Sequence, residues 1–427
     1  MMNKNTEMLV IGAGLSGLTA AAVAADQGKK VVVVASGVGV LGLTSGCIDL
    51  WGYSLNHPGE VSRDPVGDIK RLVEINTGHP YARVKFLLAE SLDFFQRACS
   101  ESGCIYVENQ GKNWLIPTAL GTLRPTFLAP ASMAVGPLKN YKKIVIAGFR
   151  ELKDFYPGVI AANLRLNADL ACDCVIEPVW VDAGGGEVSP IALARRLESP
   201  EIISGVVRQV KSYIADGTVL FFPAVLGERG GSQTLRLLSG GLGCPVFEVA
   251  GVPPSVPGQR LQNALMLYLK RRGVEVILGS KVTGVNVAGN RCNSVIVSGG
   301  VGLYKITASS YVLATGSFVG GGLEANFGGI RETVFNLPVS SLQGEFCKKD
   351  FLDKEGHPFS KLGISVNYRL QALDSRGNTM VDNLVVAGSN LAGCNYPIEK
   401  CGSGVAVATG YMAGKLAGEV RPWVLQN

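Results

Sequence analysis

Charge is scarce in this sequence. Charged side chains make up only 17% of the 427 residues, whereas a typical soluble domain has about 25%. Lysine and arginine outnumber aspartate and glutamate by six, but their densest groups are only KNYKK (139–143) and KRR (270–272). Nucleic-acid binding is therefore disfavoured, while the mild positive charge suits an anionic substrate or an acidic membrane surface.

A leader peptide and a membrane span are not expected either. The chain opens with the polar stretch MMNKNTE, which is unlike a signal peptide. The apolar stretch at 8–25 is long enough to be considered as a membrane span. Gly12, Gly14 and Gly17 interrupt it, however, and Asp26 follows. This texture predicts a strand, a turn and a helix, with no transmembrane segment.

Cysteines at metal-binding spacings are also missing. The ten cysteines include no CxxC, and the closest pairs are Cys99/Cys104, Cys172/Cys174 and Cys394/Cys401. Iron–sulfur and structural zinc sites favour tighter, repeated spacings. We therefore expect reduced, mostly buried thiols and no metal.

Glycine, by contrast, is abundant, with 55 residues, and it alternates with short runs rich in valine and isoleucine. Buried parallel strands are expected at 8–12 and 31–35 with a helix at 15–27 between them. A second α/β pattern occupies 143–171, followed by a strand at 219–227 and a helix at 260–273. Strands and hairpins follow, and 382–418 again shows strand, glycine loop and helix.

This order predicts an α/β protein with two units. A Rossmann-like FAD/NAD(P)-binding flavoprotein domain would form from both chain ends, residues 1–55 and 274–427. An inserted α/β domain for substrate or partner binding would occupy residues 56–273.

The N-terminal turn carries the motif Gly12-Ala-Gly14-Leu15-Ser16-Gly17. The first glycine permits a tight turn, the second lets backbone N–H groups approach a phosphate, and the third lets the helix pack on the strand. The helix N-terminus adds partial positive charge. The usual acidic residue for an adenosine ribose is missing. Either Ser36 makes a weaker hydrogen bond there, or no adenosine ribose binds.

The C-terminal segment resembles the second flavin motif of FAD-linked oxidoreductases. The candidate residues are Gly388, Ser389, Gly402, Ser403 and Gly404. A glycine-rich packing helix is the competing interpretation. Two glycine motifs at opposite ends of the chain favour a flavin over a nicotinamide.

Two further loops complete the candidate cofactor site. In TSGCIDL, Thr44, Ser45 and Gly46 can donate hydrogen bonds to the flavin, although this segment also suits an ordinary polar turn. The glycine-rich loop at 316–323 adds Gly316.

Several longer segments make the resemblance more specific: TSGCIDL (44–50), GHPY (78–81), LGTLRPTFL (120–128), PPSVPGQRLQN (253–263), LATGSFVGGGL (313–323) and GGIRE (328–332). In this order they resemble the B-subunit family of anaerobic glycerol-3-phosphate dehydrogenase, over essentially the whole chain. The resemblance implies oxidation of sn-glycerol 3-phosphate to dihydroxyacetone phosphate, with electrons passing to quinone. It also implies FMN in the B subunit, and two partners: an FAD-containing A subunit, together with an iron–sulfur C subunit.

FMN is thus predicted over FAD, and the missing ribose carboxylate agrees with it. A cytoplasmic protein is expected, attached to the inner face of the cell membrane through its complex. Two other functions remain open: a structural, electron-relaying subunit without a substrate site, and a stand-alone FAD-dependent reductase of a small acid.

Candidate substrate contacts come from residues beside glycine or proline turns. Arg124, Arg260 and Arg331 suit a phosphate dianion because guanidinium groups are planar donors, although each also suits a loop-bracing role. His79 in GHPY is the candidate for proton transfer, or else it braces the turn before Pro80. Glu345 and Glu399 are weaker candidates.

Overall fold

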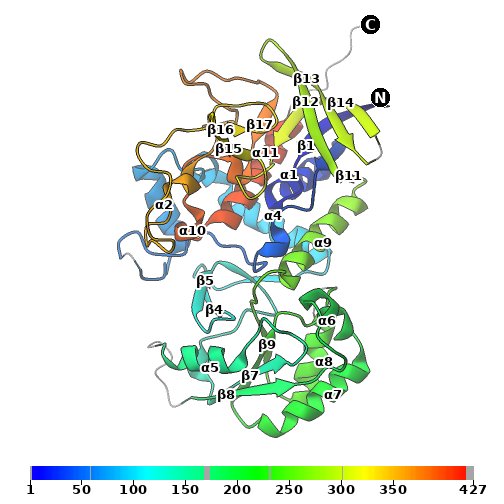
Figure 1. Ribbon diagram of the computed structural model, residues 1–427, viewed down its shortest axis with the longest axis vertical. Coiled ribbons are helices and arrows are strands. Elements are labelled where there is room, and N and C mark those ends of the chain that lie inside the picture. The colour runs from blue at the N-terminus through cyan, green and yellow to red at the C-terminus, as the bar shows by residue number, and fades with distance from the viewer. Residues whose placement is uncertain (1, 58, 168–173, 230–231, 301, 420–427) are drawn as a thin grey trace.

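Two sheets organise the chain (Figure 1). A seven-stranded sheet takes its strands from both ends of the sequence, and a four-stranded sheet takes them from the middle. The structure, a computed structural model, describes residues 2–57, 59–167, 174–229, 232–300 and 302–419. Within these residues, no helix is long and apolar enough to cross a membrane.

The seven-stranded sheet has a parallel part and an antiparallel part. Its order is β11-β2-β1-β14-β13-β12, and β17 also pairs with β14. The parallel strands are β1 (Met2–Ile11), β2 (Val31–Ala35), β11 (Glu275–Leu278), β14 (Gly302–Leu313) and β17 (Leu384–Val386). The antiparallel strands are β12 (Ser280–Ala288) and β13 (Arg291–Gly299). All five residues of β2 are buried, as its unbroken VVVVA run predicts. The Rossmann-like fold class is confirmed.

Helix α1 (Leu15–Asp26) packs closely against helix α11 (Gly402–Glu419). Glycines recur every four residues on α11. A Cβ on Gly410 would overlap the carbonyl oxygen of Ser16, and a Cβ on Gly414 would lie 2.6 Å from the carbonyl oxygen of Ala20. Missing side chains therefore let the two backbones touch, so the packing interpretation holds for this stretch of α11.

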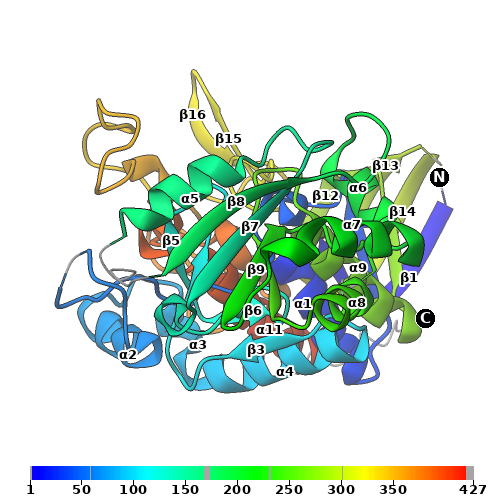
Figure 2. The same cartoon turned by 90° about the horizontal axis from the view of Figure 1, so that it is seen from below.

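The four-stranded sheet is parallel throughout, in the order β10-β9-β7-β8. Its strands are β7 (Lys143–Phe149), β8 (Val175–Val181), β9 (Thr218–Pro223) and β10 (Val246–Val249). Helices α5 (Pro157–Arg165), α6 (Pro190–Arg196), α7 (Pro200–Val210) and α8 (Ser232–Leu242) surround it. Helix α5 lies against β7 and β8 (Figure 2), and α8 contacts β10.

Proline marks where several helices begin. Helix α2 (Pro65–Ile75), α6 and α7 each start with proline after a capping aspartate or serine, a combination that satisfies free N–H groups and presets φ. Helix α5 likewise begins with a proline, Pro157. A proline inside the helix would have removed a hydrogen bond and clashed with the preceding turn.

The hydrophobic cores divide the chain differently from the expected boundaries. The first core draws on residues between 8 and 128 and between 261 and 417, whereas the second draws on residues between 135 and 256. Helices α4 (Leu88–Glu101) and α9 (Val256–Arg271) thus pack with α1 and α11, because their apolar faces meet there. The short pair β4 (Trp114–Pro117) and β5 (Leu123–Thr126) lies between the units in Figure 1. Strand β3 (Tyr106–Glu108) pairs with β6 (Leu128–Pro130), and Tyr106 and Leu128 belong to the first core.

The α1–α11 contact predicts the effect of one added methyl group. Gly410→Ala should lower the free energy of unfolding by about 1–3 kcal/mol, because the methyl group would be forced into the Ser16 backbone. Gly240→Ala is the matched control: Gly240 lies in α8 with no atom within 4 Å of its would-be Cβ, so alanine should be neutral or stabilising. Equal stability of the two variants, measured by denaturant unfolding, would contradict this account.

Candidate functional site

The candidate cofactor residues gather at one edge of the seven-stranded sheet. Gly12 follows β1, Ser36 follows β2, Gly316 lies three residues beyond β14, and Gly388 lies two residues beyond β17. All four strands are parallel neighbours, so their carboxyl ends meet. Ligands of open α/β sheets bind beyond such ends.

The turn between β1 and α1 is built from three glycines with different surroundings. Gly12 has a φ of +117°, and a Cβ there would overlap the Ala314 carbonyl oxygen. A Cβ on Gly17 would overlap the Gly12 carbonyl oxygen. Around Gly14, in contrast, no atom of the described residues beyond its own chain neighbours lies within 4 Å of the Cβ position. Gly12 and Gly17 therefore serve the fold, and Gly14 faces space that a ligand can use.

The N-terminus of α1 suits a phosphate. Gly14 is its N-cap, and no side chain of the described residues caps the helix or places an acidic group in its first turn, where Leu15 and Ser16 lie. The first N–H groups of a helix have no intrahelical acceptor, and the helix dipole adds positive charge there. These residues fit the phosphate of a nucleotide cofactor.

Hydrogen bonds tie the later glycine loops together. Ser389 Oγ accepts from the Ser317 N–H (3.2 Å), and the Asn390 carboxamide oxygen accepts from the Gly316 N–H (2.8 Å). A Cβ on Gly388 would overlap Ser16 Oγ, so this loop lies directly against α1. The structure therefore brings the N-terminal turn and the loops after β14 and β17 to one place.

The start of α11 meets the loop after β2. Ser403 Oγ accepts from the Asp49 N–H at 2.7 Å, and a Cβ on Gly404 would overlap the Tyr81 hydroxyl. Gly402 packs against Tyr396. In the same loop Thr44 Oγ1 donates to the Leu41 carbonyl (2.9 Å), and Gly46 has a φ of +74°.

Arg124 faces this loop. Its guanidinium donates to Ser45 Oγ and forms an ion pair with Asp49. Burial raises the pKa of the Asp49 carboxyl, and Arg124 opposes that rise. The charges of Arg124 and Asp49 both act on the Lys400 ammonium group. Burial and Arg124 lower the pKa of Lys400, and Asp49 opposes this. Arg124 and Lys400 thus concentrate positive charge beside the candidate cofactor residues.

The other two candidate arginines lie elsewhere. Arg331 is on the β15–β16 hairpin (Leu323–Asn326 and Gly329–Glu332), where it pairs with Glu324 at 3.1 Å. Arg260 of α9 is buried, with two hydrogen bonds to Glu248 (2.6 and 2.9 Å) and one to the Gly227 carbonyl. Arg260 thus ties α9 to β10 and to Gly227 of the four-stranded unit, which agrees with a loop-bracing role. The three arginines do not form one cluster.

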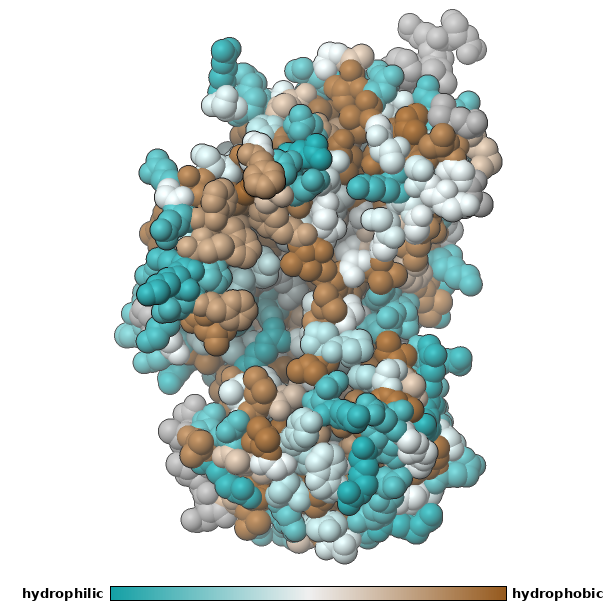
Figure 3. Space-filling view, in the orientation of Figure 1, coloured by the Kyte–Doolittle hydropathy of each residue, from teal (hydrophilic) through white to brown (hydrophobic). Residues whose placement is uncertain are grey.

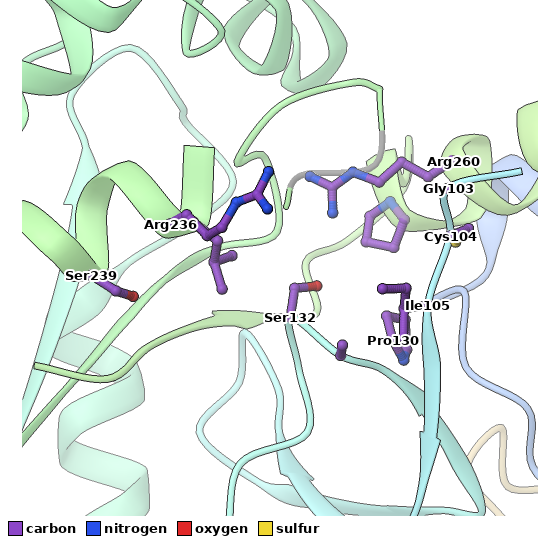
Figure 4. Close-up of a pocket in the computed structure, with 11 residues that line it drawn as sticks. Gly103, Cys104, Ile105, Pro130, Ser132, Arg236, Ser239 and Arg260 are labelled. Carbon is purple, nitrogen blue, oxygen red and sulfur yellow. The ribbon is translucent and has the colours of Figure 1, made fainter. Parts of the chain in front are cut away.

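Arg260 also borders a cavity of about 360 Å³ between α8, α9 and the β3–β6 pair. Figure 4 shows the Arg236 and Arg260 side chains extending towards each other above Ser132. Because the Arg260 guanidinium is already paired, Arg236 is the more available cation of the two.

The structure brings His79 and Glu399 together. His79 Nε2 lies 3.4 Å from Glu399 Oε2, and the imidazole is completely buried. Glu345 lies apart from them, in an exposed segment. The sequence proposed these three residues singly and gave no sign that Cys394 and Cys401 would join His79 and Glu399 in a buried group. Seven of the nine described cysteines are buried, while Cys172 lies outside the described residues.

Another residue that the sequence did not indicate is Gln262. Its Nε2 donates to the Val38 carbonyl at 3.1 Å, in the loop after β2 that also contains Ser36. Its Oε1 is buried without a partner among the described residues. An amide therefore lies at the loop where dinucleotide folds usually place a carboxylate.

Comparison with known proteins gives the class. A family model described as FAD binding domain matches residues 7–405, which include both glycine segments. A structure of the open conformation of a flavocytochrome c3 fumarate reductase aligns with 97% of this chain and 78% of its own, at 10% identity and a TM-score of 0.46. By the family match, the protein is a flavoprotein of the FAD-binding class, and its cofactor is a flavin.

Sequence relatives narrow the class to a family. The B subunit of a probable anaerobic glycerol-3-phosphate dehydrogenase from Halobacterium salinarum is 31% identical, over 97% of this chain and 98% of the relative. The corresponding protein of Vibrio cholerae is 30% identical, over 95% of each chain. The chain belongs to the B-subunit family of anaerobic glycerol-3-phosphate dehydrogenase, so the resemblance is confirmed. The relatives' names describe one subunit of a larger enzyme.

The open space at Gly14 predicts a separation of binding from folding. Gly14→Val should abolish flavin retention and leave the unfolding transition nearly unchanged, because the side chain meets the ligand space and not the protein. The matched control is Gly158→Val, which places the same side chain in the first turn of α5, again with no atom within 4 Å. Flavin content is read from absorbance of the purified proteins. A full flavin complement in Gly14→Val would show that the turn is only structural.

The Arg124–Asp49 pair predicts a pH-dependent defect. Arg124→Ala leaves the Asp49 carboxylate buried without its cation, at a cost of about 3 kcal/mol near pH 7. Without Arg124 the folded pKa of Asp49 lies further above its unfolded value, so stability falls as pH rises. The deficit relative to wild type should therefore shrink from pH 7 to pH 5 in urea unfolding. Adding Asp49→Asn should remove this dependence, and a constant deficit in the single variant would refute it.

Proposed function

We propose that this chain is the flavin-bearing B subunit of a quinone-linked anaerobic glycerol-3-phosphate dehydrogenase. It would take part in oxidising sn-glycerol 3-phosphate to dihydroxyacetone phosphate and pass the electrons towards quinone. The main support is the similarity to relatives named as this subunit, across nearly the full length of both chains. The open N-terminus of α1 supports a bound phosphate-bearing cofactor.

The reaction removes two electrons and two protons from the C2 carbinol of the substrate. A bound flavin supplies a two-electron acceptor for this chemistry. We propose that the residues of the N-terminal turn hold the cofactor phosphate, with Ser389, Ser403 and the loop of Thr44, Ser45 and Gly46 around the rest of the flavin. Among the candidate arginines, Arg124 is the one beside this loop. It would receive the substrate phosphate together with Lys400.

His79 supports a different role from the one expected. Since its imidazole is fully buried against Glu399, it would act on neighbouring side chains and not on the substrate.

The identity of the flavin needs separate consideration. The missing carboxylate after β2 favours FMN, as does the resemblance stated above. The family description favours FAD. Gln262 favours it too: its Nε2 donates to the Val38 carbonyl in the loop after β2, and its Oε1 has no partner among the described residues. We propose FAD, since an amide oxygen can accept one ribose hydroxyl hydrogen bond, worth about 1 kcal/mol.

We also propose a peripheral membrane location through two partners, an FAD-containing A subunit, together with an iron–sulfur C subunit. Apolar side chains are exposed near the β15–β16 hairpin and in the segment that follows: Val319, Phe327, Phe346, Phe351 and Leu352. Figure 3 shows brown and tan side chains over this region. Exposed apolar groups of this kind are typical of contacts between proteins. The inserted four-stranded unit would provide further contacts to partner or substrate.

Two measurements on the purified chain test the proposal. Heat release and chromatography should yield one FAD per chain; stoichiometric FMN would restore the prediction made from the missing carboxylate. Glycerol 3-phosphate is then added without oxygen, first to the chain alone and then to the chain with the FAD-containing partner. The flavin should bleach in the second mixture, and also in the first if this chain holds the substrate. Bleaching only in the presence of that partner would assign the substrate site to it and make this chain an electron relay. No bound flavin of either kind would overturn the proposal.

A further inference from the structure

Two buried thiols face each other immediately before α11. Cys394 Sγ and Cys401 Sγ are 3.3 Å apart, and the residues are 8% and 0% exposed. A disulfide needs only a small further approach of the two sulfur atoms from this separation. The pair is therefore poised for bond formation and shielded from solvent.

The loop between the thiols is firmly positioned. Helix α10 (Tyr396–Glu399) turns the chain back, and Lys400 then adopts a left-handed conformation with a φ of +49°. The Glu399 carboxylate accepts from the Asn395 N–H at 2.8 Å, and its carbonyl accepts from the Gly52 N–H at 2.9 Å. A non-glycine residue in this region of φ costs energy that the surrounding structure must compensate. The contacts thus bring Cys401 back to Cys394.

Acid–base groups border the pair. Glu399 Oε2 lies 3.4 Å from Cys401 Sγ and 3.4 Å from His79 Nε2. The Cys401 thiol and His79 both stabilise the thiolate of Cys394, and its pKa is lowered although burial opposes this. A low thiol pKa favours the nucleophilic form. One thiol is therefore prepared to react, and a carboxylate is within reach of the proton of the other.

A metal ion is the main alternative. The four donor atoms lie within 4.8 Å of one another, and these residue types can bind zinc. A histidine that binds through Nε2, however, carries its proton on Nδ1. Here Nδ1 accepts a hydrogen bond from the Tyr81 N–H at 3.2 Å, which places the proton on Nε2. The geometry favours thiol chemistry over a metal.

The thiol pair adjoins two segments of the candidate flavin site. Cys401 directly precedes Gly402, the first residue of α11. Tyr81, two residues after His79, donates its hydroxyl hydrogen to the Leu50 carbonyl at 2.9 Å, in the loop that also meets Ser403. The pair therefore lies between the start of α11 and the end of the loop at 43–50.

We propose that Cys394 and Cys401 form a redox-active dithiol that exchanges two electrons with the flavin of this chain. The inference rests on the proposed flavin site. On oxidation the Cys401 S–H bond breaks, and one S–S bond forms between the two thiolates as together they lose two electrons. The Cys401 proton passes to Glu399, and the two electrons pass to the oxidised flavin. The reverse reaction returns them and restores the dithiol.

The experiment counts electrons and thiols in the purified full chain with its flavin. Anaerobic dithionite titration should take four electrons per flavin in the wild type, and two in Cys394→Ser and in Cys401→Ser. Cys244→Ser is the matched control, because Cys244 is also a buried thiol, 8% exposed, in the inserted unit; it should still take four. Alkylation and peptide mass analysis across dithiothreitol redox buffers should show a 394–401 disulfide that forms reversibly.

Three results would overturn the proposal: two electrons per flavin in the wild type, no 394–401 disulfide at any redox poise, or one zinc per chain with both thiols protected from alkylation. The wild-type measurements need no variant to fold. They also distinguish failure of the dithiol proposal from failure of the proposed oxidation of glycerol 3-phosphate. A chain that takes four electrons but is not bleached by glycerol 3-phosphate would support the dithiol and count against the substrate. In a chain without flavin, a reversible 394–401 disulfide would support a redox-active dithiol but would overturn its electron exchange with a flavin.

Discussion

Direct backbone contact between α1 and two other segments is the constraint on which the site depends. Gly12 and Gly17 let the turn close against Ala314, and Gly410 and Gly414 bring α11 onto α1. Any larger residue at these points would push the elements apart by the width of a side chain. The open helix N-terminus, the loops after β14 and β17, and the start of α11 can meet only because the spacing is this small.

The sequence predicted most where a residue type has a mechanical consequence within a few positions. The β1–α1–β2 unit follows from its glycines and valines, and its strands and helix form close to the expected ranges. It failed where the partner is distant in the chain. Arg260 looked available because nothing nearby shows that Glu248 on β10 would take its donors, and no local pattern joins His79 to Glu399, 320 positions away.

Two ion pairs are buried in a chain that has few charged residues. Arg260–Glu248 is almost entirely enclosed, and Arg124–Asp49 is mostly so. Such pairs add little net stability, but losing one partner leaves a charge that is costly to bury. Each pair connects different elements: Arg260–Glu248 joins α9 to β10 of the four-stranded sheet, and Arg124–Asp49 joins β5 (Leu123–Thr126) to the loop after β2. Their arrangement therefore specifies how the loops and the units sit around the candidate site.

The seven-stranded sheet is assembled from strands at both ends of the sequence, and this sets an order of events during synthesis. All strands of the inserted sheet lie between 143 and 249, so that unit has its complete sheet as soon as this stretch has left the ribosome. The first three elements, β1, α1 and β2, must wait for β14, β17 and α11, which are made more than 250 residues later. Domains fold as units during synthesis. The nascent N-terminal turn thus remains without Ala314 and α11 for most of translation, and a cofactor held at this turn would be incorporated only near its end.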